Sequence, residues 1–287
     1  MGIGKYMPGP LKNALKKYLY LDTRSVYEFP AKTADRQFRG KTAIVTGGAG
    51  GIGSAIAYRL AAEGAHVFVL GRTKAALDQV VAEIRAMDGS AEAYAVDVCD
   101  YAALGKCRDF IDGHDKAKGE LFLVTCAGGG ARSRAKVFSE QDISVIDDVI
   151  CTNLMGTVNC CHVFAPRLLA SGGSVVNISS VIGIGGKEKY CDYAAAKAGI
   201  IGFTRSLAIE FSPHGVRCNV VSPGKIQRGI MSGAQIDDEI SRNYVGYGGK
   251  PQDVAGTVSF LLSDDARFIT GQNVCVDGGR TLGLHGD

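Results

Sequence analysis

The sequence predicts an α/β protein built on a single doubly wound parallel sheet, and three observations support this fold class. From residue 40 onwards, short β-rich runs alternate with longer helical stretches. Several of the β-rich runs are largely apolar, as expected for strands that helices cover on both faces. No internal repeat and no low-complexity linker follows residue 40, so we expect one domain.

The expected elements follow one another in regular alternation. The strands are short aliphatic runs between turn-forming residues, at 42–46, 65–70, 91–96, 121–124, 174–178, 216–221 and 273–276. The helices are Ala-rich or amphipathic stretches, at 54–63, 74–87, 102–111, 140–169, 193–211 and 251–262. Ser139 is a candidate cap for the long helix 140–169, and Pro251 suits the first position of the last helix.

Residues 1–39 differ from the rest and form an expected N-terminal extension to a domain at 40–287. Leu11, Leu15 and Leu19 repeat every four residues beside lysines, which indicates a short amphipathic helix. We favour a surface helix that docks on its own domain or on a neighbouring subunit. The alternative is a targeting or membrane-surface helix.

Composition narrows the class of protein. The 287 residues are 46% hydrophobic, and a net charge of +3 argues against a nucleic-acid or membrane partner. The nine cysteines are odd in number and form no CxxC pair, so we expect reduced thiols and a cytoplasmic location. The five histidines show no metal-ligand spacing, and we expect no metal site.

A glycine-rich turn joins the first expected strand to the first helix. It reads Thr46-Gly47-Gly48-Ala49-Gly50-Gly51-Ile52-Gly53. Glycines at such a turn let backbone N–H groups approach a pyrophosphate, and the helix N-terminus adds a favourable dipole. The strand–turn–helix context therefore favours a dinucleotide site over a turn without a ligand.

The end of the second expected strand discriminates between cofactors. An acidic residue there would bind the ribose hydroxyls of NAD, whereas an Arg suits the extra phosphate of NADP. The sequence reads Gly71-Arg72-Thr73, with no carboxylate. We therefore expect NADP, with NAD less favoured; the alternative for Arg72 is a solvent-facing side chain.

Tyr193 and Lys197 lie four residues apart on an expected helix, so they share one face. A phenol has an ordinary pKa of about 10, and a nearby ammonium lowers it by favouring the phenolate. Tyr193 could then exchange a proton with a carbonyl or alcohol oxygen. Ser179 and Ser180 end another strand at the same edge of the sheet, where ligands bind in such folds, although both suit a simple turn.

These residues give the chain its resemblance to the short-chain dehydrogenase/reductase family, which has a Rossmann fold. The resembling segments cover residues 40–280 in the family's order. They are Thr46–Gly53, Asp97-Val98, Cys126-Ala127-Gly128, Asn153, Ser180, Tyr193-Ala194-Ala195-Ala196-Lys197 and Pro223-Gly224.

The resemblance implies a role for each matching residue. Tyr193 would be the general acid/base, Lys197 would hold the nicotinamide ribose, Ser180 would orient the substrate oxygen, and Asn153 would support a proton-relay water. Implied cofactor contacts are Gly47, Gly51, Ile52, Gly53, Arg72, Thr73, Asp97, Val98, Ala127, Gly128, Tyr193, Lys197, Pro223, Gly224 and Ile226. The family is usually a homotetramer or homodimer in which the helices 140–169 and 193–211 pair.

Two segments depart from the family's pattern. Thr125-Cys126 replaces the usual Asn-Asn, which puts in doubt a side-chain brace between neighbouring strands. After Pro223-Gly224 the family's Thr is absent, and Arg228 could instead meet an anionic group or face solvent. We expect residues 183–192 to line the substrate cleft and residues 228–249 to form a mobile lid.

The expected activity is NADP(H)-dependent interconversion of a ketone and a secondary alcohol. Sugars, steroids, acyl thioesters and small ketones all remain open as substrates. The alternatives are an NADPH-dependent enoyl-thioester reductase of the same fold and a non-catalytic dinucleotide-binding sensor or scaffold. The complete Ser180, Tyr193 and Lys197 set argues against both.

Overall fold

The computed structural model of the chain describes residues 37–117, 119–129, 132–227 and 243–283. Its seven parallel strands form one sheet in the order β3-β2-β1-β4-β5-β6-β7. The strands are β1 (Thr42–Thr46), β2 (His66–Gly71), β3 (Ser90–Ala95), β4 (Leu121–Thr125), β5 (Gly173–Ile178), β6 (Val216–Pro223) and β7 (Asn273–Val276). The expected doubly wound parallel sheet is confirmed, and the strand order reverses between β1 and β4.

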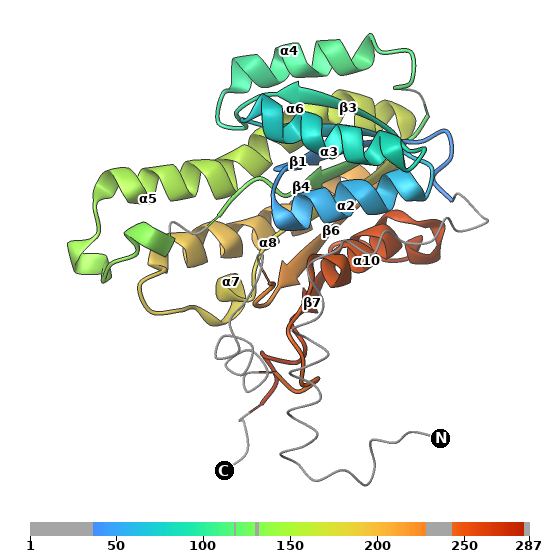
Figure 1. Cartoon of the computed structure of the whole chain (residues 1–287). Helices are drawn as coiled ribbons and strands as arrows, with labels where there is room; N and C mark the ends of the chain where they lie inside the picture. The colour runs from blue at the N-terminus through green and yellow to red at the C-terminus, as the bar shows by residue number, and fades with distance from the viewer. Residues whose placement is uncertain (1–36, 118, 130–131, 228–242, 284–287) are drawn as a thin grey trace, which may run out of the picture.

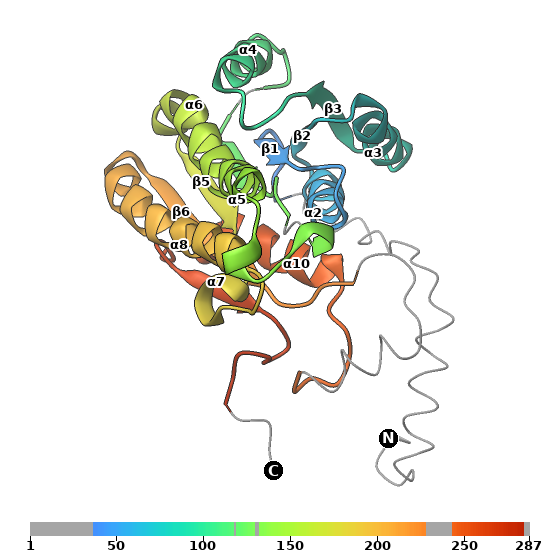
Figure 2. The same ribbon diagram turned by 90° about the vertical axis from the view of Figure 1, so that its left-hand side faces the viewer.

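Helices cover both faces of the sheet (Figures 1 and 2). On one face lie α2 (Gly51–Ala62), α3 (Lys74–Ala86) and α10 (Pro251–Leu262). On the other lie α4 (Tyr101–Asp112), α6 (Gly156–Ser171) and α8 (Cys191–Phe211). Helix α3 shows why these segments dock: its buried residues Leu77, Val80, Val81 and Ile84 recur at helical spacing on one side.

The expected long helical stretch 140–169 is present from Ile143 to Ser171, but a π-helical turn interrupts its α-helical hydrogen bonding. A 3₁₀ turn at Phe138–Glu140 is followed by α5 (Ile143–Ile150), a π-helical turn at Cys151–Met155 (η4), and α6. The cap is Asp142, whose carboxylate accepts a hydrogen bond from the Ser144 N–H at 2.9 Å, and Ser139 lies inside the 3₁₀ turn. Asp142 suits the capping position because its carboxylate also accepts a hydrogen bond from the Ser144 hydroxyl, at 2.8 Å.

The first described residues enter the core directly. Phe38 is buried, its ring meets that of Phe122 edge-on at 5.0 Å, and its N–H donates to the Glu63 carbonyl. The expected amphipathic helix with Leu11, Leu15 and Leu19 lies outside the described residues. None of the helices in the described ranges combines the length and apolar character needed to cross a bilayer.

Candidate active site

The glycine turn after β1 packs too closely for any other residue at two positions. Gly47 has φ of +64°, and a Cβ there would lie 2.8 Å from the backbone of Cys126 and Ala127 at the end of β4. A Cβ on Gly53 would lie 2.2 Å from the Gly47 carbonyl oxygen. The turn therefore closes tightly onto the end of β4 and onto the first turn of α2.

The N-terminus of α2 fits a pyrophosphate. No side chain caps it, and its first turn holds no acidic residue. Within the described ranges, the N–H groups of Gly51, Ile52 and Gly53 meet no hydrogen-bond acceptor. A Cβ on Gly51 would find nothing closer than Pro251 at 4.0 Å, so the approach is open. Free N–H groups at a helix N-terminus are what a bound phosphate group requires.

The ends of β2 and β3 flank this turn. Gly71 is tightly packed, since a Cβ there would lie 3.3 Å from Leu77. Arg72 and Thr73 are exposed, Thr73 makes no side-chain capping bond, and Arg72 meets no charged partner in the described part of the chain. Asp97 is exposed, and its carboxylate accepts from the Cys99 N–H at 2.9 Å.

Val98 is a buried apolar residue next to Asp97. Its side chain is buried against the start of α6, where a Cβ on Gly156 would lie only 2.4 Å away. Its carbonyl accepts from Asn159 at 3.0 Å. Arg72 and Thr73 follow β2, and Asp97 and Val98 follow the neighbouring strand β3, so all four lie at the carboxyl edge of the sheet.

Side chains brace β1, β4 and β5 beneath the site. The Thr46 hydroxyl accepts from the N–H groups of Cys126 and Ala127, both at 3.1 Å. The Thr125 hydroxyl donates to Asn177 Oδ1 at 2.6 Å, and Asn177 Nδ2 donates to Thr204 on α8 at 2.9 Å. A side-chain brace between β4 and β5 is therefore present in this chain, and Thr125 supplies it although the family's usual Asn is absent.

Two adjacent serines at the end of β5 have different roles. The Ser179 hydroxyl donates to the Lys197 carbonyl at 2.7 Å, which ties β5 to α8. Ser180 Oγ accepts from the Ile182 N–H at 3.2 Å, at the start of the short helix α7 (Ile182–Gly185). Among the described residues Ser180 donates to no acceptor, so its proton is available to a ligand.

Tyr193 and Lys197 lie together on α8. Lys197 Nζ lies 5.6 Å from the centroid of the Tyr193 ring. The lysine is buried, and its ammonium donates to the Ile178 carbonyl at 2.9 Å. Burial lowers the pKa of Lys197 to about 8, because desolvation penalises the charged form. Tyr193 is half-buried, and the Tyr190 ring meets it edge-on at 6.4 Å.

Asn153 lies in the π-helical turn η4, and Gly128 lies close to both Asn153 and Lys197. A point at the ideal Cβ position of Gly128 is 2.4 Å from Asn153 Oδ1 and 3.5 Å from Lys197 Nζ. The amide is fixed, because Oδ1 accepts from the Gly129 N–H and Nδ2 donates to the carbonyls of Gly129 and Val149. A π-helical turn inside a helix often marks a functional site.

The end of β6 closes the site. The Pro223 carbonyl accepts from the Val181 N–H at 3.1 Å, which joins it to the Ser180 loop. Gly224 must lack a side chain, since a Cβ would lie 2.7 Å from Asp277. Ile226 pairs with Gly249 and lines a cavity of about 340 Å³ with Val245, Tyr247, Val274 and Val276. Arg228 and most of the expected lid, residues 228–242, lie outside the described residues.

The structure places the expected residues at the ends of six strands, β1 to β6, and the sequence did not predict the residues that support them. Thr125, Asn177, Thr204 and the Ile178 carbonyl hold the site but carry no recognisable motif. Only the Thr125-Cys126 departure pointed to this region. In the described ranges, no three His, Cys, Asp or Glu side chains cluster so as to hold a metal ion.

The reversed strand order and the glycine turn at its switch point define a dinucleotide-binding α/β fold. A family model described as enoyl-(acyl carrier protein) reductase matches residues 47–281. The chain belongs to the short-chain dehydrogenase/reductase family and is an oxidoreductase of that family, whose members bind NAD or NADP.

Relatives in the family differ in their named substrates. The chain is 33% identical over 253 residues to a 7alpha-hydroxysteroid dehydrogenase of Bacteroides fragilis, covering 86% of this chain and 96% of the relative. It is 36% identical over 255 residues to a (3R)-3-hydroxyacyl-CoA dehydrogenase of Mus musculus, covering 85% and 97%. A 3-oxoacyl-[acyl-carrier protein] reductase with bound NAD from Brucella melitensis has a TM-score of 0.79 at 28% identity, covering 99% of each chain.

Proposed function

We propose that the protein interconverts a ketone and a secondary alcohol with NADP(H), using Tyr193 as the general acid/base. The observation that carries the proposal is the convergence of Ser180, Tyr193, Lys197 and Asn153 at the ends of β4 and β5. We further propose that residues 40–287 form the catalytic domain. The names of the relatives support the reaction type, since they include dehydrogenation of hydroxysteroids and 3-hydroxyacyl thioesters.

Each side chain has a distinct task in this proposal. The Ser180 hydroxyl donates to the substrate oxygen and orients it beside the Tyr193 phenol. Tyr193 gives its proton to that oxygen in reduction and takes it back in oxidation. The Lys197 ammonium, 5.6 Å from the Tyr193 ring, favours the phenolate. Asn153, fixed behind Gly128, supports a water that returns the proton from solvent.

The proposed cofactor site follows the strand ends. The α2 N-terminus, with Gly47, Gly51, Ile52 and Gly53, would hold the pyrophosphate. Asp97 and Val98 would meet the adenine, and Lys197 with Tyr193 the nicotinamide ribose. Ala127, Gly128, Pro223, Gly224 and Ile226 would flank the nicotinamide, which when bound supplies or accepts the hydride. The absence of a carboxylate beside Arg72 and Thr73 supports NADP over NAD.

The description of the matching family model favours a second candidate, reduction of an enoyl thioester with NADPH. We rank it below ketone reduction, because the complete Ser180, Tyr193 and Lys197 set suits proton transfer to oxygen. A non-catalytic sensor ranks lower still. We also propose a homotetramer or homodimer. The cysteine content, with several of the nine side chains buried, supports a reducing cytoplasmic location.

Tyr193→Phe tests the acid/base assignment. We expect kcat to fall roughly 10³-fold, because a positioned general acid contributes about that much, while the Kd for NADPH stays within about twofold. Tyr101→Phe, an exposed tyrosine on α4, is the matched control and should keep full activity. Substantial turnover by Tyr193→Phe would refute the assignment.

Arg72→Ala tests the cofactor assignment. Fluorescence titration should show tighter binding of NADPH than of NADH, and Arg72→Ala should weaken NADPH alone by about 10-fold or more, as expected for a lost charge-assisted bond. Arg108→Ala removes an exposed arginine whose ion pair among the described residues is with its neighbour Asp109, and it should change neither Kd. Equal affinity of the wild-type protein for both cofactors would contradict the proposal.

A further inference from the structure

The two edges of the sheet differ in how much apolar surface they expose. In the described part of the chain, fourteen large hydrophobic side chains are exposed. Seven of them lie in connections that follow the carboxyl ends of strands: Val137, Phe138, Ile184, Tyr244, Val245, Tyr247 and Leu282. The connections at the opposite edge expose only Phe268, and the other six side chains lie on helices.

One of these exposed apolar side chains, Ile184, lies close to the proposed catalytic residues. Ile184 is 50% exposed on α7, four residues after Ser180. This short helix packs directly on α8, because a Cβ on Gly183 would lie 2.7 Å from the Ala198 nitrogen and 2.9 Å from Lys197 Cβ. Ile184 thus lies on a short helix that follows Ser180 and packs on the helix that carries Tyr193.

A second apolar group borders the same edge on the β6 and β7 side. The Tyr244 N–H donates to the Gly278 carbonyl at 2.8 Å, so the segments after β6 and β7 are joined. Tyr244 and Tyr247 are each at least half exposed on this joined surface. The adjacent cavity of about 340 Å³ has further apolar walls from Ile226, Val274 and Val276.

We propose that the substrate is a ketone or secondary alcohol on a large apolar skeleton, of the size of a medium-chain or polycyclic compound. The inference rests on the proposed function and selects one class among its open substrates. An apolar skeleton covers exposed Ile, Phe and Tyr side chains and removes them from water. A sugar would instead lose water from its hydroxyl groups against apolar side chains that offer them no hydrogen bond.

A matched series of alcohols with NADP⁺ tests the substrate class. We expect kcat/KM to rise about twofold for each added methylene, or roughly 50-fold from 2-butanol to 2-decanol, which is partial burial of each group. Sorbitol should be a poor substrate. Better turnover of sorbitol than of 2-decanol would overturn the substrate class and leave the proposed function standing. Turnover of no alcohol, or of an enoyl thioester alone, would overturn both.

Two variants locate the apolar contact. Ile184→Ser and Phe138→Ser should each raise KM for 2-decanol about fivefold or more and leave the Kd for NADPH unchanged. Phe268→Ser, the matched change at the opposite edge, should leave KM unchanged. Size-exclusion chromatography of all three distinguishes the rival occupant, a second copy of the chain. A loss of oligomer in Ile184→Ser and Phe138→Ser with KM unchanged would overturn the proposal.

Discussion

Two buried basic residues lie at opposite edges of the sheet, and burial lowers the pKa of both, although we assign a catalytic role to one of them alone. Lys197 lies at the carboxyl edge and His66 at the amino edge, where it begins β2. Burial is the main cause that lowers the pKa of both, to about 8 for Lys197 and to about 4 for His66. A lowered pKa therefore marks burial in this protein and does not by itself mark a catalytic group.

The surroundings separate the two bases. The His66 ring stacks on His114 at 5.2 Å, and its Nδ1 pairs with Ser90 at 2.8 Å, while its Nε2 is buried without a hydrogen-bond partner in the described residues. Its charged neighbours, Lys116 and Arg85, lower its pKa further. Lys197 instead lies close to the Tyr193 ring and donates to the Ile178 carbonyl at the end of β5. Function follows from that geometry.

Lys197→Met should have the largest effect of the variants that compare the two edges, because it removes the buried base at the carboxyl edge. We expect kcat to fall about 10³-fold, because the phenolate of Tyr193 loses its cation. The free energy of unfolding at pH 7 should rise by about 1–2 kcal/mol, since removing a buried charge outweighs the lost bond to the Ile178 carbonyl. Enzyme assays and urea unfolding measure both, and exposed Lys106→Met should change neither.

The lowered pKa of Lys197 also predicts the direction in which the free energy of unfolding changes with pH. Its folded pKa of about 8 is below the ordinary 10.5, so between these pH values the unfolded chain holds a proton that the folded chain lacks. Stability should rise with pH across this window in the wild-type protein. A wild-type slope that persists in Lys197→Met would contradict the assignment.

His66→Phe should change the pH dependence of stability without changing activity, because His66 has a structural role alone. The folded pKa of about 4 lies below the ordinary 6.5, so wild-type stability should fall by about 3 kcal/mol as the pH drops from 6.5 to 4. The variant keeps the stacking on His114 but cannot titrate, and its unfolding free energy should be flatter in this range. Activity at pH 7 should not change. Exposed His214→Gln should keep the wild-type slope.

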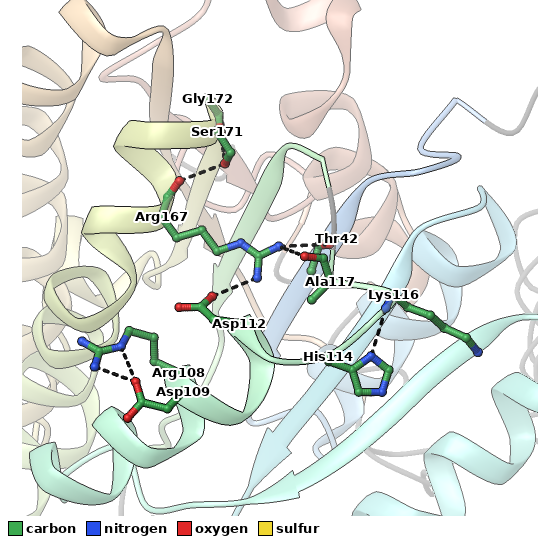
Figure 3. A network of polar contacts seen from close by, with 10 residues as sticks. All are labelled: Thr42, Arg108, Asp109, Asp112, His114, Lys116, Ala117, Arg167, Ser171 and Gly172. Carbon is green, nitrogen blue, oxygen red and sulfur yellow. Dashed lines mark hydrogen bonds and ion pairs between the residues drawn. The ribbon is translucent and has the colours of Figure 1, made fainter.

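Arg167→Ala probes the polar network at the amino edge (Figure 3). The Arg167 guanidinium, whose side chain is 12% exposed, pairs with Asp112 at 3.0 Å and donates to the Ala117 carbonyl at 2.7 Å. Its loss should lower the free energy of unfolding by about 2 kcal/mol and leave kcat/KM unchanged. Arg108→Ala, which breaks an exposed pair with Asp109, should leave the free energy of unfolding nearly unchanged.

The same contrast explains what the sequence could predict. Hydrophobic periodicity located the strands and most helices, because each periodic face is buried against the sheet. The residues 140–169 kept a helical pattern throughout, so the π-helical turn that carries Asn153 left no signal. The supports of Lys197 were equally hidden, since Ile178 contributes only a carbonyl and Asn177 meets Thr204 across 27 positions. Contacts between distant segments depend on the fold, which periodicity does not encode.

Thr125→Val probes the smallest expected effect, at the brace beneath the site. It removes the donor to Asn177 Oδ1, whose other described partner is the thiol of Cys161 at 3.7 Å, a weak donor. We expect the free energy of unfolding to fall by about 1–2 kcal/mol, with kcat/KM lowered no more than about threefold. Thr125→Ser, which keeps the hydroxyl, should recover most of the stability. Thr125→Val could instead lose as much activity as Lys197→Met while remaining folded. That result would show that the spacing of β4 and β5 directly controls catalysis. It would contradict our distinction between supporting residues such as Thr125 and reacting residues such as Lys197.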